Sequence, residues 1–230
     1  MQARFLPTWL VVDIKMFFEQ ARPDIQNRPA FPLKPGQHQT AILEFLRDTL
    51  PEVANSLLRN RTSKLPTLDE DDITREISNL LNDRLRPSAR SYLFRFEAKT
   101  GPDILMFASP YEPFSKPLLL IEAKRLPPTS NRDYVRTGIG RFKTEDHGKD
   151  HDSAAMLGYI QARSFEYWHN TINEWIDDLI ADHTQVPPWE INDKLTSRAG
   201  ASIPEYASTH HRKHLGPITI CHLWLDFTSD

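Results

Sequence analysis

Three short runs of strand-forming residues follow one another along the middle of the chain, and they limit it to folds built around antiparallel hairpins. The runs cover residues 91–97, 102–108 and 117–124, and each is rich in Leu, Ile, Phe or Tyr and bounded by Gly or Pro. Because the connections between them are short, successive strands must pair antiparallel rather than through crossovers. The sequence therefore predicts a β-meander.

Apolar residues at helical spacing precede the meander. They predict one kinked helix or two short ones around Pro51, within residues 38–58. A second helix is predicted over 67–85, where Thr67 and Glu70 have the spacing of a capping box. Its acidic first turn is interpreted as a helix start that faces the positive end of the helix dipole, rather than as a metal cage.

The segments after the meander alternate between polar and apolar. A polar loop is expected over 125–152, followed by a long helix over 156–179 whose aromatic residues are assigned to the core. Residues 182–217 are expected to be irregular, and 217–227 to form a buried final strand.

Together these elements predict an α/β fold with a mixed sheet. The chain has 230 residues, of which 39% are hydrophobic and 26% charged, as in a globular protein with a core. Residues 1–60 are expected to form an N-terminal lead, a Pro-rich connector and a helical extension packed on a core domain of residues 61–230. The single cysteine excludes an internal disulfide and Cys-rich zinc sites. With no signal peptide or membrane span in sight, we expect an intracellular protein, cytoplasmic or nuclear, without a membrane partner.

The spacing of two acids matches one hairpin register. If 102–108 pairs with 117–124, directly opposed residues have a constant index sum, and Asp103 then faces Glu122. Lys124 shares the face of Glu122, because side chains alternate along a strand. A second Glu-x-Lys pattern at residues 97–99 has no opposing acid by the same arithmetic.

Two facing carboxylates repel each other unless a cation or a shared proton neutralises them. Mg²⁺ or Mn²⁺ would meet that need, with the Ala123 carbonyl as a further ligand. Glu76 lies beside the apolar stripe of the helix over 67–85 and is a candidate third acid, or else an acid paired with an arginine such as Arg95. Lys124 could act on a metal-bound water or stabilise charge on a phosphate. The hypothesis is a site for phosphodiester hydrolysis; the alternative is a surface salt bridge.

These residues resemble the PD-(D/E)xK nuclease superfamily, which has the restriction-endonuclease-like fold. The resemblance rests on Pro102-Asp103, on Glu122-Ala123-Lys124, on Glu76 in the preceding helix, and on a predicted αβββαβ element order over about 67–227. It implies that Asp103, Glu122 and Glu76 hold a metal ion and that Lys124 is the catalytic lysine. Exonuclease-like members carry a Gln and a Tyr one helical turn apart, whereas here Gln161 is followed by Phe165.

Charge is unevenly distributed along the chain. The net charge of −3 gives no general reason to expect a nucleic-acid partner, yet residues 84–163 carry a net +5 and residues 164–197 a net −6. The basic segment includes glycines that would let backbone N–H groups approach phosphates, although a flexible solvated loop is an equal alternative. The candidate substrate-binding residues are Arg136, Arg141, Lys143, Lys149 and Gln161.

The sequence thus predicts an Mg²⁺- or Mn²⁺-dependent nuclease that acts on nucleic acid, with DNA favoured over RNA. The alternative is a catalytically silent module of the same fold that binds nucleic acid or scaffolds a complex. A homodimer or a larger complex is compatible with the sequence but not indicated by it. His147 with His151, and the histidines of 210–214, are alternative zinc sites or merely solvated side chains.

Overall fold

The computed structural model describes residues 35–61, 68–85, 92–97, 101–108, 115–129, 132–198 and 203–228. The chain divides into two units, Met1–Gln37 and His38–Asp230. The predicted N-terminal lead and most of the Pro-rich connector lie outside the described residues. The sheet and its helices belong to the second unit, apart from residues 35–37 at the start of the first helix.

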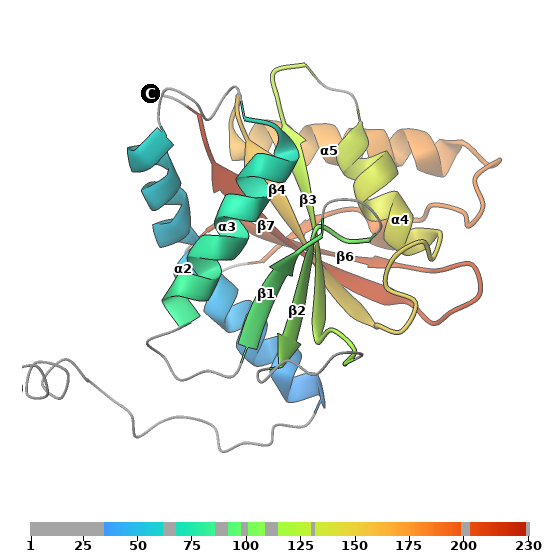
Figure 1. Ribbon diagram of the computed structural model, residues 1–230. Helices are drawn as coiled ribbons and strands as arrows, with labels where there is room; N and C mark the ends of the chain where they lie inside the picture. The colour runs from blue at the N-terminus through green and yellow to red at the C-terminus, as the bar shows by residue number, and fades with distance from the viewer. Residues whose placement is uncertain are drawn as a thin grey trace, which may run out of the picture. The chain divides into compact units, whose positions relative to one another are not determined.

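Thirteen elements are described, and Figure 1 shows their arrangement. In chain order they are α2 (Pro35–Arg61), α3 (Glu70–Leu85), β1 (Tyr92–Phe96), β2 (Ile104–Ala108), β3 (Leu119–Leu126), the π-helix η3 (Tyr134–Ile139), α4 (Gly140–Lys143), β4 (Ser153–Ile160), α5 (Phe165–Ala181), the short 3₁₀-helix η4 (Ile191–Asp193), β5 (Thr196–Ser197), β6 (Glu205–His210) and β7 (Ile218–Asp226).

The strands form one mixed sheet in the order β1-β2-β3-β4-β7-β6-β5. The first three strands pair antiparallel, as the meander predicts. The central strands β3, β4 and β7 run parallel to one another, and β6 and β5 complete the sheet with antiparallel pairs. The predicted class, α/β with a mixed sheet, is confirmed.

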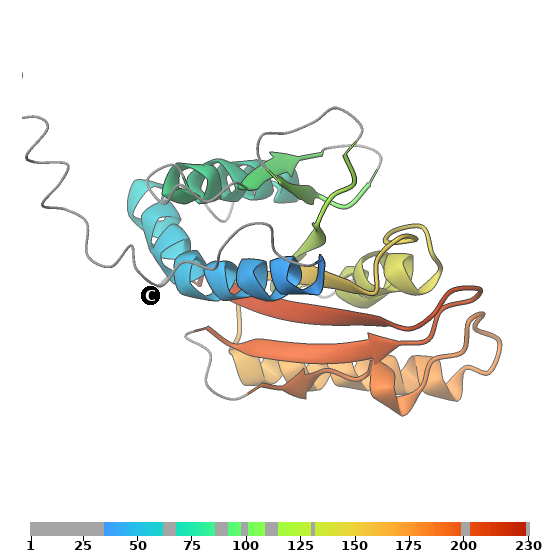
Figure 2. The same ribbon diagram turned by 90° about the horizontal axis from the view of Figure 1, so that it is seen from below.

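Helices cover both faces of this sheet. One core lies between the sheet and helices α2 and α3, where Leu46 and Ile77 pack with Leu157 and Leu223. The other lies between the opposite face and η3, α4 and α5, where Trp168 packs with Trp224. Figures 1 and 2 show α2 and α5 on opposite sides of the sheet. Trp168 and Trp175 of α5 lie in this core and Phe165 packs against it, as predicted, whereas Tyr167 is exposed.

Both helices before the meander form. α2 is a single helix that contains Pro51. α3 begins with acidic residues, and its N-terminus is capped by Asp69, whose Oδ1 accepts a hydrogen bond from the Asp72 N–H at 2.7 Å. The predicted capping residue Thr67 lies outside the described residues. In the described part of the chain, no helix has the length and apolar character needed to cross a membrane.

The prediction of a long helix from residue 156 onward is wrong at its start. Residues 153–160 form β4, and the helix begins at Phe165. Every residue from Ala154 to Ile160 is buried, because β4 lies between β3 and β7 and is covered on both faces. A strand of this kind has a continuous apolar run, which also matches helical spacing.

The predicted loop over 125–152 is also corrected. Its first residues extend β3, and residues 134–143 form η3 and α4. Two of the glycines expected in a phosphate-binding loop lie in these helices. A Cβ on Gly138 would clash with Met156 Cε and lie 3.4 Å from Lys124 Cγ, so a larger residue here would require the Met156 side chain to shift. The segment predicted as irregular, 182–217, contains β5 and β6.

A partly buried ion pair attaches α2 to the sheet. Arg47 donates to Glu205 through Nε at 2.6 Å and through Nη2 at 2.7 Å. Burial alone would raise the pKa of Glu205, whose side chain is 3% exposed, but the bidentate bond to Arg47 outweighs burial and the pKa lies below its ordinary value. The carboxylate is therefore more stable in the folded chain than in the unfolded chain.

This pair gives the protein a pH-dependent stability. Because the pKa of Glu205 is lower in the folded state, its contribution is fully present above the pKa of an unfolded Glu, about 4.3, and is lost as the pH falls through the folded value. We expect Glu205→Gln to lower the free energy of unfolding by about 1–3 kcal/mol at pH 7, and the difference from wild type to shrink below about pH 4. Urea unfolding across this pH range measures it.

The matched control is the exposed ion pair of Glu52 and Arg84, in which Arg84 Nη1 lies 2.6 Å from Glu52 Oε2. Glu52→Gln should change the free energy of unfolding by less than about 1 kcal/mol at every pH. Equal effects of the two substitutions would contradict the assignment to Glu205.

Candidate active site on the β2–β3 hairpin

The β2–β3 hairpin places Asp103 beside Glu122, in the predicted register. The observed pairs are Ile104 with Ile121, Leu105 with Leu120 and Met106 with Leu119. Asp103 and Glu122 occupy the next position of this ladder. The Ala123 N–H donates a hydrogen bond to Asp103 Oδ2 at 2.7 Å, so the hairpin itself fixes this carboxylate. The predicted register is confirmed.

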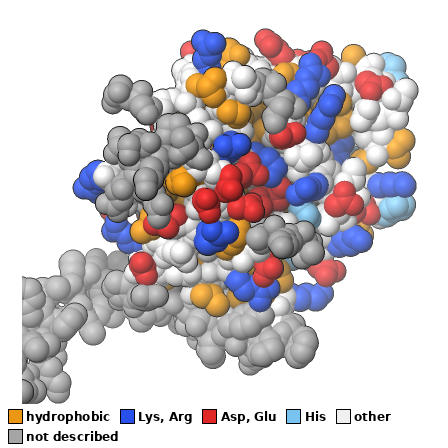
Figure 3. Space-filling model, turned by 45° about the horizontal axis from the view of Figure 1, so that its top comes forward, with side chains coloured by type: hydrophobic (Ala, Val, Ile, Leu, Met, Phe, Trp, Pro, Cys, Tyr) orange, Lys and Arg blue, Asp and Glu red, His pale blue; other side chains and the backbone are white. Residues whose placement is uncertain are grey.

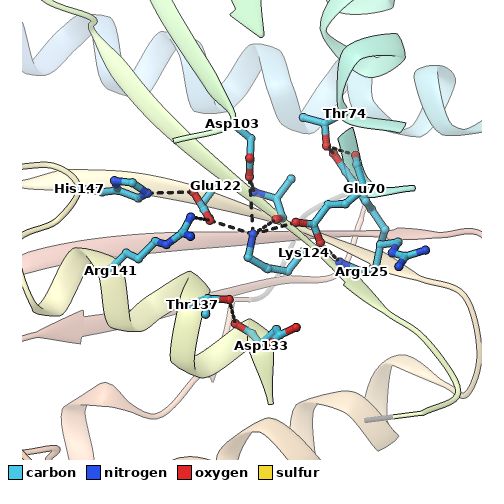
Figure 4. A network of polar contacts seen from close by, with 12 residues as sticks. Glu70, Thr74, Asp103, Glu122, Lys124, Arg125, Asp133, Thr137, Arg141 and His147 are labelled. Carbon is cyan, nitrogen blue, oxygen red and sulfur yellow. Dashed lines mark hydrogen bonds and ion pairs between the residues drawn. The ribbon is translucent and has the colours of Figure 1, made fainter. Parts of the chain in front are cut away.

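The ammonium group of Lys124 lies among the acids. Nζ is 2.9 Å from Glu122 Oε1, 2.9 Å from Glu70 Oε1 and 3.8 Å from Asp103 Oδ2. It also donates a hydrogen bond to the Ala123 carbonyl at 2.7 Å. Figure 4 shows these groups converging on Nζ. One cation thus lies where three of the predicted metal donors meet.

The acid of α3 that contacts Lys124 is Glu70, whereas the sequence predicts Glu76 for this place. Glu70 is the first residue of α3, and its Oε2 accepts a hydrogen bond from the Arg125 N–H at 2.9 Å. Glu76 lies roughly 9 Å further along the helix axis at 1.5 Å per residue. It is not among the acids that contact Lys124. The N-terminus of α3, rather than its middle, therefore faces the site.

Glu122 is the most buried of the three acids. Its side chain is 0% exposed, against 14% for Asp103 and 29% for Glu70. Arg141 in α4 approaches Glu122 Oε1 at 3.2 Å, and His147 Nε2 lies 3.5 Å from Glu122 Oε2. Both Glu122 Oε2 and His147 Nε2 are buried, and neither has a hydrogen-bond partner among the described residues.

Burial controls the charge of these groups. Burial, reinforced by the charge of Glu122, raises the pKa of Asp103 to about 7, and burial also raises the pKa of Glu122. Burial opposes the ammonium of Lys124, but the three surrounding carboxylates outweigh it and raise its pKa above the ordinary value. Burial lowers the pKa of His147. With no metal bound, these carboxylates therefore favour the protonated form of Lys124.

The donor set is chemically suited to a divalent cation. Carboxylate and carbonyl oxygens are the ligands that Mg²⁺ and Mn²⁺ take, and the ammonium of Lys124 already occupies a position among them. Glu122 Oε2 is a further buried oxygen that accepts no hydrogen bond from the residues described. Within the described ranges, no three His, Cys, Asp or Glu side chains form a ready-made metal-binding group. Binding a metal ion would therefore require Lys124 to release these oxygens.

The predicted substrate-binding residues do not all lie at the acids. Arg141 does, and its side chain is 42% exposed. Arg136 and Lys143 line a separate cavity of about 320 Å³ between α4, the end of α5 and residues 182–189. The side chain of Lys143 is 1% exposed, and its ammonium pairs with Asp193.

The other two predicted contacts lie outside the described network of the acids. Lys149 is exposed in the turn before β4. Gln161 follows β4, and its side-chain nitrogen is buried without a hydrogen-bond partner among the described residues.

The histidines of the predicted zinc clusters are separated in the structure. His151 lies against the Pro117 carbonyl, at 2.9 Å, while its sequence neighbour His147 faces Glu122. His210 is buried against Asp193 and Ser208, whereas His214 pairs with Glu145. These four histidines therefore contact different partners.

Sequence reasoning missed two members of the site, Glu70 and His147. In the sequence, Glu70 looks like an acid of an ordinary helix start. Nothing local indicates that it lies next to β3, because that position depends on contacts between residues distant in the chain. His147 follows α4, and its spacing from His151 indicates only a zinc ligand or a solvated side chain.

Comparisons of the chain with protein-family models, with curated proteins and with solved structures found no match.

Proposed function

We propose that the chain is a divalent-metal-dependent nuclease that hydrolyses phosphodiester bonds, with DNA favoured over RNA as the substrate. The observation that carries the proposal is the buried arrangement of Asp103, Glu122 and Lys124 on one hairpin, with a Glu122 oxygen that has no hydrogen-bond partner in the described part of the chain. Strongly perturbed acids beside a lysine are typical of sites that bind a cation and a charged substrate.

The order of elements supports the same proposal. α3, β1, β2, β3, the helical segment of η3 and α4, and β4 follow one another in the chain. This is the αβββαβ order on which the resemblance to PD-(D/E)xK nucleases depends, with the second helix earlier in the chain than the sequence predicts. In that resemblance, Glu70 would replace Glu76 as the acid contributed by α3, the helix before the three strands.

The charges around the acids favour a phosphate-containing substrate. Figure 3 shows acidic side chains gathered on one face, with Lys and Arg side chains around them. Arg141 is partly exposed beside Glu122, so its guanidinium can reach a phosphate oxygen as well as the acid. The guanidinium of Arg125 donates to the Leu68 carbonyl and holds the start of α3 next to β3.

Asp103 and Glu122, with the Ala123 carbonyl, are the groups that would hold the metal ion. The ion supplies Lewis-acid activation of the phosphate and lowers the pKa of a bound water. The ammonium of Lys124, which lies 2.9 Å from Glu122 Oε1, would stabilise negative charge that develops on the phosphate. Arg141 would orient the substrate by its contact with a non-bridging oxygen.

The test is cleavage of plasmid, linear and single-stranded DNA and of RNA, each with Mg²⁺, with Mn²⁺ or with EDTA. We expect cleavage with either ion and a loss to background with EDTA, because the carboxylates alone do not activate water. The substrate that is cleaved fastest, compared at equal nucleotide concentration, identifies the nucleic acid.

Absence of cleavage with both ions would contradict the enzyme proposal. If the protein then still bound nucleic acid, with an affinity that falls as salt rises, the catalytically silent module would be the better description.

A further inference from the structure

Two buried atoms face each other at the edge of the candidate site. Glu122 Oε2 and His147 Nε2 are 3.5 Å apart, and neither makes a hydrogen bond within the described structure. The side chains of Glu122 and His147 are 0% and 9% exposed. Unpaired polar atoms at this depth are rare, because each costs about 1–3 kcal/mol. Such a pair indicates a position for a ligand that both atoms contact.

The imidazole is held in this orientation by its own segment. The backbone N–H of His147 donates to the Arg141 carbonyl at 3.0 Å. The imidazole ring packs edge-on against the Phe142 ring, with 5.9 Å between the ring centroids. Glu145, two residues before, accepts hydrogen bonds from the backbone N–H groups of His214 and Leu215. The turn that carries His147 is thus fastened to the chain before β7.

The separation of the two atoms suits two ligands of one metal ion. Ligands about 2.1 Å from an ion and at right angles to each other are roughly 3 Å apart. Glu122 Oε2 and His147 Nε2 would need to move by only a few tenths of an ångström to reach that separation. A carboxylate and an imidazole are also the ligand types that first-row transition metals share.

We propose that His147 Nε2 and Glu122 Oε2 bind the divalent ion of this site together, and that the imidazole makes the site select Mn²⁺ over Mg²⁺. This inference rests on the proposed function, because it concerns the same metal ion. Mg²⁺ takes oxygen ligands and gains little from a nitrogen donor. Mn²⁺ also prefers oxygen, but it is the first member of the transition-metal series whose ions bind nitrogen, so one imidazole adds more to its affinity than to that of Mg²⁺.

The first test is direct and uses the unmodified chain. Mn²⁺ is titrated into the protein, and electron spin echo envelope modulation is recorded on the bound ion. A nitrogen hyperfine coupling is expected from the directly bonded imidazole. Its absence in a protein that does bind Mn²⁺ overturns the inference and leaves the proposed function standing.

The second test compares His147→Gln with His183→Gln, an exposed histidine outside the site. We expect His147→Gln to remove the nitrogen coupling and to weaken Mn²⁺ binding about ten-fold or more, with less than about a two-fold change for Mg²⁺ measured by competition. His183→Gln should match wild type in both. Thermal unfolding without metal verifies that each variant is folded.

The failures are distinguishable. Equal losses of Mn²⁺ and Mg²⁺ affinity in His147→Gln overturn the selectivity, and unchanged Mn²⁺ affinity overturns the ligand role. If wild type binds neither ion in the millimolar range, both the inference and the proposed function are wrong. If wild type binds Mn²⁺ and Glu122→Gln abolishes that binding while His147→Gln does not, only the inference is wrong.

Discussion

Asp103→Asn is expected to lower the rate of phosphodiester cleavage by about 10³-fold while leaving the protein as stable as wild type or more stable. Asn keeps the shape of the side chain, and its oxygen can still accept the Ala123 N–H. It removes a negative charge that would help to hold the metal ion. Cleavage at saturating Mg²⁺ or Mn²⁺, followed with the best substrate, measures the loss.

The stability half of this prediction follows from the surroundings of Asp103. Its carboxylate is buried next to that of Glu122, and like charges in a buried site repel each other. In the metal-free protein, Asn relieves this repulsion, so the urea midpoint should be unchanged or higher. A loss of activity caused by unfolding would lower the midpoint instead.

Glu97→Gln is the matched control, because Glu97 begins the second Glu-x-Lys pattern and pairs with Arg95 at 2.6 Å. It should cleave like wild type. Lys124→Met should also lose activity, since the amino group 2.9 Å from Glu122 Oε1 is removed. Asp103→Asn or Lys124→Met protein that cleaves at the wild-type rate would refute the assignment of these residues.

The hairpin was predictable because its information is local. The strands before and after the turn are close in the sequence, and one hypothesis about the turn sets the partner of every residue in them. Asp103 and Glu122 follow from that register, and the structure pairs Ile104 with Ile121 as it requires. Lys124 then follows from strand alternation alone.

Glu70 was not predictable by the same route. The spacing of apolar residues in α3 fixes which face of the helix is buried, and on that basis Glu76 is the better candidate. It does not fix how far the helix is shifted along the sheet. In the structure Glu70 Oε2 accepts the Arg125 N–H, so the first turn of α3 lies over the end of β3. That shift depends on packing between segments distant in the chain.

The basic residues of α4 show the same limit for charge. Arg141 and Lys143 are two positions apart, and composition treats them alike. On a short helix, however, two positions turn a side chain to a different face. Arg141 is 42% exposed at Glu122, whereas Lys143 is 1% exposed. A count of charges along the sequence therefore overestimates what a phosphate can contact.

Lys143→Met is accordingly expected to destabilise the fold by about 3–5 kcal/mol rather than to weaken substrate binding. Lys143 Nζ lies 2.9 Å from Asp193 Oδ2 and donates to the His211 carbonyl at 3.2 Å. Asp193 is 1% exposed and is also in contact with His210. Removing the ammonium leaves a buried carboxylate without its full counter-charge. Urea unfolding at pH 7 measures the loss.

The control for Lys143→Met is the exposed ion pair of Lys194 and Asp177, in which Lys194 Nζ lies 2.7 Å from Asp177 Oδ2. Lys194→Met should cost less than about 1 kcal/mol, because water and salt screen this pair. At a temperature where Lys143→Met remains folded, its affinity for nucleic acid and the salt dependence of that affinity should equal those of wild type. Arg141→Met should instead reduce the salt dependence by about one phosphate contact. The opposite result, a shallower salt dependence for Lys143→Met with full stability, would return Lys143 to the substrate surface.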